Sequence, residues 1–171
     1  MAGIAVNEVL EMDVTVREAH PGDLPEIVPL WLQLMSFHEE LDAGYSMVED
    51  AAERWIRYIA PSFNDESWRI FVAQIEDELV GYAAVVIQDH PPVYVSTKHG
   101  VLESIAVSRE HRGRGIGKRL VRAAEQWLRS RDVFEMTVRI DERNTASRAL
   151  FESRAFEPWI VVRRKVLGRK D

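Results

Sequence analysis

A stretch in the middle of the chain joins an apolar strand to an amphipathic helix through a turn rich in glycine and arginine. Residues 101–107, VLESIAV, have the β-branched and apolar character of a buried strand. Apolar side chains then recur at helical spacing in Ile116, Leu120, Ala124, Trp127 and Leu128. Because the turn between them is short, the sequence predicts a strand–loop–helix unit within a mixed α/β domain.

The turn itself is strongly basic. Residues 108–122 contain six Arg or Lys and one Glu, a local net charge of +5, although the whole chain carries −6. A helix start offers unpaired backbone N–H groups and the positive end of the helix dipole, and glycine lets an anion approach them closely. The turn is therefore predicted to bind a small polyanion, whereas the overall negative charge argues against a general nucleic-acid binder.

Two familiar phosphate-binding loops fit this turn poorly. A P-loop has the pattern G-x-x-x-x-G-K-[ST], but only three residues separate Gly113 from Gly117, and Arg119 stands where the magnesium-binding hydroxyl belongs. A dinucleotide fingerprint requires G-x-G-x-x-G, whereas the spacing here is G-x-G-x-G and follows four expected strands. Neither chemistry is favoured.

The remaining elements follow from periodicity and capping signals. Asp23 and Glu26 form a capping-box pattern before one helix, and Ser46 and Glu49 repeat it before a second. The element order is βαα-βββ-αβ-αβ, without repeats or linkers. Strands are expected at residues 13–19, within 68–89 (two strands with a turn near 76–78), and at 101–107, 133–140 and 158–166; the third and fourth helices are expected at 116–130 and 144–153.

The turn RGRGIG resembles R/Q-x-x-G-x-G/A, the pyrophosphate-binding motif of the GNAT superfamily of acetyl-CoA-dependent N-acetyltransferases. The segment NTASRALFESRAF is similar to that family's N-x-x-A-x-x-L-Y-x-x-x-G-F, and the element order agrees over essentially the whole chain. The resemblance implies a single domain over residues 1–171 with the GNAT α/β (α+β) fold. In that fold a mixed, mostly antiparallel sheet is flanked by about four helices, and a splayed strand pair binds coenzyme A.

The resemblance also implies which residues contact the co-substrate acetyl-CoA. The backbone of the turn would wrap the pyrophosphate, the pantetheine arm would pair with the open edge of strand 101–107, and Asn144 resembles a coenzyme-contacting Asn. The expected set comprises Ile105, Ala106, Val107, Arg112, Gly113, Arg114, Gly115, Ile116, Gly117, Lys118, Asn144, Ser147 and Phe151.

Two residues are expected to act on the reacting atoms. The backbone N–H of Val107 would stabilise the developing oxyanion, as the resemblance implies. Glu103 is the candidate base, because an alkyl ammonium with a pKa near 10 must lose a proton before it attacks, and Glu103 is the lone carboxylate of an apolar strand. Strict alternation places Glu103 on the same face as Ile105 and Val107, although a bulge would change that and a solvent-facing Glu is the alternative.

The fourth helix departs from the family pattern. Phe151 stands where many relatives have a Tyr that protonates the leaving thiolate, Ala155 replaces a glycine and Ser147 replaces an alanine. Unassisted departure of the thiolate, or a proton from Tyr82, Tyr94 or water, are the alternatives. The leading expectation is acetyl transfer to a primary amine of a small molecule; a protein N-terminus or lysine as acceptor, or a coenzyme-binding module without turnover, are the alternatives.

Other expectations concern partners and location. Glu39, Glu40 and Asp42 lie in the region that lines the acceptor pocket of the family and could attract a cationic amine. No metal, nucleic acid or membrane partner is expected, and a homodimer is possible through the final strand. The chain has no cysteine, no basic start in its first twelve residues and no apolar run long enough to span a membrane, so a cytoplasmic protein is expected.

Overall fold

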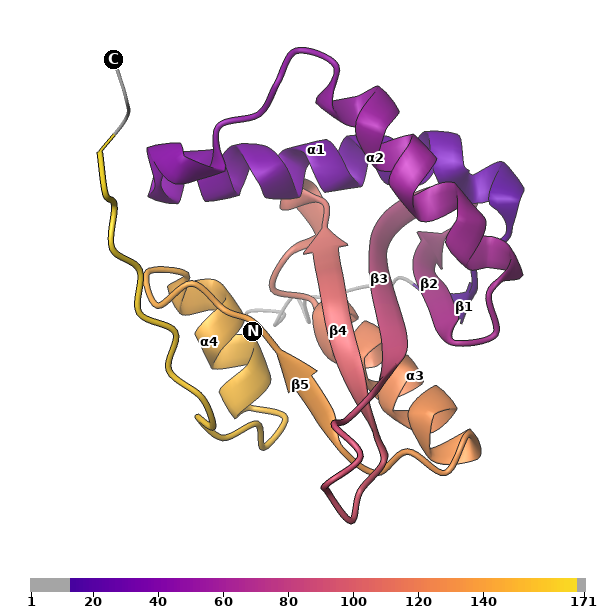
Figure 1. The fold of residues 1–171 in the computed structure, drawn as a ribbon. Coiled ribbons are helices and arrows are strands. Elements are labelled where there is room, and N and C mark those ends of the chain that lie inside the picture. The colour runs from indigo at the N-terminus through magenta and orange to yellow at the C-terminus, as the bar shows by residue number, and fades with distance from the viewer. Residues whose placement is uncertain (1–12, 169–171) are drawn as a thin grey trace, which may run out of the picture. The chain divides into compact units, whose positions relative to one another are not determined.

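A computed structural model describes residues 13–168, which form two compact units divided after Arg139. The larger unit is built on one five-stranded sheet with the order β1-β2-β3-β4-β5 (Figure 1). The first four strands are antiparallel and β5 runs parallel to β4. The strands are β1 (Val14–Glu18), β2 (Trp68–Ile75), β3 (Glu78–Asp89), β4 (Lys98–Val107) and β5 (Met136–Val138).

Helices cover both faces of this sheet. The helices of the larger unit are α1 (Leu24–Leu41), α2 (Ala51–Ile59) and α3 (Ile116–Ser130). Helices α1 and α2 lie over one face, and α3 packs on the other (Figure 1). The fold is therefore the mixed, mostly antiparallel α+β arrangement that the sequence predicted. None of the helices within residues 13–168 is both long and apolar enough to cross a membrane.

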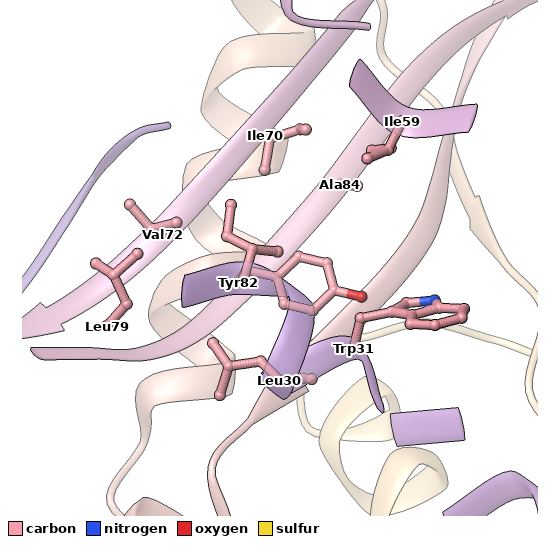
Figure 2. Packing of buried hydrophobic residues seen from close by; sticks show 10 residues of the cluster. Leu30, Trp31, Ile59, Ile70, Val72, Leu79, Tyr82 and Ala84 are labelled. Carbon is pink, nitrogen blue, oxygen red and sulfur yellow. The ribbon is translucent and has the colours of Figure 1, made fainter. Parts of the chain in front are cut away.

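The core under α1 and α2 is aromatic. The indole rings of Trp31 and Trp55 stack with centroids 4.8 Å apart, and the ring of Tyr82 lies edge-on to Trp55 at 6.2 Å. Figure 2 shows Tyr82 beside Leu30 and Trp31. Stacked and edge-on aromatic pairs are favourable beyond the area they bury, so this cluster fixes α1 and α2 against β3.

The starts of the first two helices differ from the capping prediction. Asp23 precedes α1, but its side chain does not cap the helix. Instead it accepts two hydrogen bonds from the Arg17 guanidinium, at 2.7 and 2.9 Å, and one from the backbone N–H of His20 at 2.8 Å. Helix α2 begins only at Ala51, after the Ser46–Glu49 signal. The Asp23 carboxylate therefore pairs with Arg17 of β1 and does not cap the helix.

Strand β4 differs from a regular strand in two ways. Its pairing with β5 is limited to residues Gly100–Leu102, so the two strands diverge beyond Leu102, as the expected splay requires. Strand β5 itself is shorter than the predicted strand 133–140. The second irregularity is a β-bulge: Ala84 pairs with Ser104 and Val85 with Leu102, which leaves Glu103 without an opposite residue on β3.

The smaller unit, from Ile140 onward, contains α4 (Thr145–Glu152). The expected helix over 144–153 is confirmed, with Asn144 as its N-cap. The strand expected at residues 158–166 is wrong, because this segment has no strand pairing in the structure. Its apolar side chains, Trp159, Ile160, Val161, Val162 and Val166, are exposed. A β-branched pattern predicts a strand only where a partner strand completes its hydrogen bonds.

Candidate active site

The glycine turn ends in an uncapped helix start. Gly113 and Gly115 both have φ of +76°, the left-handed region that favours glycine. Gly115 is the N-cap residue of α3, and no side chain caps the helix there. A Cβ atom added at either glycine would meet no atom of residues 13–168 within 4 Å, so this part of the chain leaves the space in front of the turn open. The backbone N–H groups of the first turn are therefore available to an anion, which fits a coenzyme pyrophosphate.

The basic side chains around the turn divide into two groups. Arg112, Arg114 and Lys118 are exposed and flank the open space. Arg119 instead points away and donates to the backbone oxygen of Val14 at 2.9 Å, so it fastens α3 to β1. Arg112 also donates from Nε to the backbone oxygen of Val107 at 3.0 Å, which ties the turn to the end of β4. The turn and the end of β4 are thus held as one structure.

Within residues 13–168, no strand pairs with the edge of β4 beyond its β5 pairing, so this edge is open there. Ser108 N–H donates to the oxygen of Val80 at 2.9 Å, and Ala106 is opposite Tyr82 in the antiparallel ladder. Since hydrogen-bonding residues alternate along an antiparallel strand, the backbone groups of Ile105 and Val107 point away from β3. The Val107 oxygen is occupied by Arg112, and the Val107 N–H is directed toward the open edge. An extended chain laid along this edge would meet these groups as an added strand.

The bulge decides where the candidate base points. Strict alternation would place Glu103 on the face of Ile105, and that prediction is wrong because Glu103 is the inserted residue of the bulge. Its side chain keeps 24% of its surface exposed, and its carboxylate lies 3.8 Å from Nη2 of Arg139. Burial raises the pKa of Tyr58 on α2, and the charge of Glu103 raises it further. Glu103 therefore faces the side of the sheet that carries α2.

Tyr58 and Arg139 lie beside Glu103, and the sequence did not indicate either of them. Tyr58 is 62% exposed and lies edge-on to Trp68, with ring centroids 6.4 Å apart. Arg139 follows β5 and is exposed. The only available signal was the position of Arg139 at the end of a strand parallel to β4, because the ends of neighbouring parallel strands meet at one edge of a sheet.

The expected coenzyme contacts on α4 belong to the smaller unit. The side chain of Asn144 accepts a hydrogen bond from Ser147 N–H at 2.9 Å, so Asn144 acts as a helix cap. Phe151 is buried and packs edge-on against Phe156, with centroids 5.1 Å apart. Phe151 offers no proton to a leaving group. The coenzyme contacts expected of these three residues stay predictions.

The two tyrosines considered as proton donors have unfavourable positions. Tyr94 precedes β4, and Val107 ends it, nine residues beyond Lys98, which corresponds to about 30 Å. Tyr82 is fully buried, and its hydroxyl makes no hydrogen bond of ordinary geometry. Burial raises the pKa of Tyr82, although nearby Ser104 lowers it, so this phenol keeps its proton. Water is the remaining donor of the three alternatives.

The acidic residues at the end of α1 are partly engaged. Glu40 lies 3.5 Å from Nη2 of Arg109, and Asp42 accepts a hydrogen bond from Gly44 N–H at 2.7 Å. Within residues 13–168, no group of three or more His, Asp or Glu side chains is arranged to hold a metal ion. At Glu40, the negative charge that was expected to attract a cationic acceptor is therefore balanced by Arg109.

A glycine cradle at a helix start, beside a strand that diverges from its parallel neighbour, defines a coenzyme-binding acyltransferase fold. The chain belongs to the acetyltransferase (GNAT) family, whose profile matches residues 34–156. Mycothiol acetyltransferase of Thermobispora bispora is 39% identical over 150 residues, covering 86% of this chain and 48% of that protein. Mycothiol acetyltransferase of Kocuria rhizophila is 31% identical, covering 92% and 56%. The chain spans about half the length of these curated relatives.

Solved structures share the fold at low sequence identity. A mutant protein of Bacillus halodurans superposes with a TM-score of 0.79 at 18% identity, covering 90% of this chain and 99% of that one. An aminoglycoside acetyltransferase, AAC(6')-Iy, in complex with a bisubstrate analogue, has a TM-score of 0.70 at 22% identity, with the same coverage. These likenesses confirm the fold.

Proposed function

We propose that this chain is an acetyl-CoA-dependent N-acetyltransferase that acts on a primary amine of a small molecule. The observation that carries the proposal is the joined pair of an uncapped glycine cradle and an open β4 edge, linked by the bond from Arg112 to Val107. The curated relatives are named for acetylation of mycothiol, and several solved relatives for acetylation of aminoglycosides, which supports a small-molecule acceptor.

The chain's own groups supply three parts of the reaction. The backbone of Arg112–Lys118 would hold the pyrophosphate, and the open edge at Ile105–Val107 would align the pantetheine arm. The Val107 N–H, directed to that edge, would stabilise the oxyanion. Acetyl-CoA supplies the activated acetyl group, which the amine takes by direct attack through a tetrahedral intermediate.

Glu103 would remove the proton from the amine through water. Glu103 lies four positions before Val107, about 13 Å along a regular strand and slightly less across the bulge, which exceeds the reach of one glutamate side chain. At least one water therefore lies between the carboxylate and an amine that attacks near Val107. The thiolate would leave unassisted or take its proton from water, since Phe151 has no proton to give.

Thermal unfolding with acetyl-CoA, ATP, NAD and no ligand, measured side by side, tests the proposal. A ligand at about 100 times its dissociation constant adds about 2.7 kcal/mol of stability, which for a domain of this size raises Tm by about 5–10 °C. A rise with acetyl-CoA alone, followed by release of coenzyme A thiol in a screen of amines, is expected. A rise with ATP or NAD and none with acetyl-CoA would contradict the proposal.

A further inference from the structure

Three side chains from three elements converge beside the β4 bulge. Glu103 comes from the bulge, Arg139 from the residue after β5, and Tyr58 from α2. The carboxylate and the guanidinium are 3.8 Å apart, and the electrostatic influence of both charges reaches the Tyr58 hydroxyl. The Tyr58 ring lies edge-on to Trp68 and is 62% exposed, so it forms a solvent-facing side of the cluster. We call these three residues the bulge cluster.

The charges of the bulge cluster constrain what can bind there. The side chain of Arg139 is 84% exposed, and its guanidinium already neutralises the Glu103 carboxylate. An acceptor with a second amino group at this end would bring ammonium charge next to this guanidinium, and the two cations would compete for one carboxylate. Once Glu103 takes a proton, Arg139 would also be left without a counter-charge. An acceptor that carries its own carboxylate avoids both costs, because that carboxylate can replace Glu103 as the partner of Arg139.

The length of the acceptor follows from the position of the oxyanion site. The attacking amine must lie near the Val107 N–H, whereas Arg139 binds at the level of Glu103, about 13 Å back along the strand. The flexible side chain of Arg139 covers part of this separation. The α-amino group of an amino acid, one carbon away from its carboxylate, is too close to serve both positions.

We propose that the acceptor is an ω-amino carboxylate, with Arg139 binding the carboxylate and several carbon atoms separating it from the amine. This inference rests on the proposed function and narrows its substrate class. Arg139 is then a specificity-determining residue, and Tyr58 lies beside the carboxylate end of the acceptor. Polycationic amines are disfavoured, since Arg109 also neutralises Glu40 at the end of α1.

The test compares acceptors that differ only in the carboxylate. Release of coenzyme A thiol from acetyl-CoA is measured with glycine, β-alanine, γ-aminobutyrate and ε-aminocaproate, and with alkylamines of matching length. We expect kcat/KM to rise with length along the carboxylate series, and ε-aminocaproate to exceed hexylamine by about tenfold or more, a difference of about 1.4 kcal/mol. Equal or better use of hexylamine would overturn the inference and leave the proposed function intact.

Variants assign the preference to Arg139. Arg139→Gln should lose about tenfold with ε-aminocaproate, while activity with hexylamine stays within about twofold, because hexylamine carries no charge at the Arg139 end. Arg131→Gln is the matched control: Arg131 forms an ion pair with Glu66 at 3.7 Å, before rather than after β5, and this change should leave the preference unaltered. An equal loss with both acceptors in Arg139→Gln would refute a carboxylate-binding role.

A binding measurement covers the case in which no acceptor is turned over. Calorimetric titration of ε-aminocaproate and hexylamine into the protein saturated with coenzyme A should show tighter binding of the carboxylate, and Arg139→Gln should remove this difference in affinity. Absence of carboxylate binding, or equal affinities, would overturn the inference. Failure of acetyl-CoA itself to bind would instead overturn the proposed function.

Discussion

Substitution of Gly115 by alanine separates backbone strain from steric crowding at the glycine turn. Gly115 has φ of +76° and ψ of 2°, and an added Cβ would meet no atom within 4 Å. Alanine at position 115 therefore destabilises the folded state only by the free energy of placing an L-residue in the left-handed region, about 1–2 kcal/mol. Alanine also lowers the conformational entropy of the unfolded chain, which stabilises the folded state by about 0.4–1 kcal/mol. The net loss is about 1 kcal/mol, or about 2–4 °C in Tm.

The same substitution should weaken acetyl-CoA binding more than it weakens folding. The N–H groups at the start of α3 lie beside Gly115, and a methyl group in the open space would obstruct a phosphate approaching them. Loss of one hydrogen bond to a charged group is worth about 1.5–3 kcal/mol, so the dissociation constant should rise by about 10- to 150-fold. Urea unfolding gives the stability change, and calorimetric titration with acetyl-CoA gives the affinity change.

Gly115→Asn provides the matched control. Asparagine adopts positive φ more readily than alanine, so it should restore part of the stability lost in Gly115→Ala. Its larger side chain still occupies the open space, so acetyl-CoA affinity should stay low. Unchanged affinity in both variants would refute the assignment of the turn to the coenzyme. Unchanged stability in Gly115→Ala would refute the strain calculation.

Three further predictions follow from single contacts. Glu103→Gln should lower kcat by about 10²–10⁴-fold with acetyl-CoA affinity within about twofold, and unchanged turnover would exclude the base role. Arg17 lowers the pKa of Asp23, so this carboxylate stabilises the fold above its ordinary pKa of 3.8 and the contribution is lost as pH falls through the lower folded value. Asp23→Asn should therefore cost about 1–3 kcal/mol in urea unfolding at pH 7, and this cost should shrink as the pH is lowered below 3.8; a cost that does not depend on pH would contradict this. Gly100→Ala would place a methyl group 2.7 Å from Cδ2 of buried Leu128. This crowding should lower the free energy of unfolding by about 1–2 kcal/mol, after allowance for the greater stability of alanine than glycine in a strand, and should leave acetyl-CoA affinity unchanged. An unchanged free energy of unfolding would show that the Leu128 side chain moves aside without cost.

The strand–loop–helix unit was predictable because its signals are local. Positive φ at Gly113 and Gly115 requires glycine, and the apolar spacing of α3 ends at Ser130 as the sequence indicated. Local signals failed where a distant partner decides the outcome. Asp23 has a capping sequence, yet Arg17 takes its carboxylate, and residues 158–166 have a strand pattern but no partner strand.

The bulge in β4 is the feature that the sequence could not supply, and the candidate chemistry depends on it. A bulge is a property of two paired strands, so no propensity within residues 101–107 specifies which residue is inserted. With regular pairing, Glu103 would share a face with Ile105, on the side of the sheet covered by α3. The inserted residue turns this carboxylate toward α2 and Arg139, while Ile105 and Val107 keep their backbone groups at the open edge. One extra residue thus lets a single strand present a base on one side and a coenzyme-pairing edge on another.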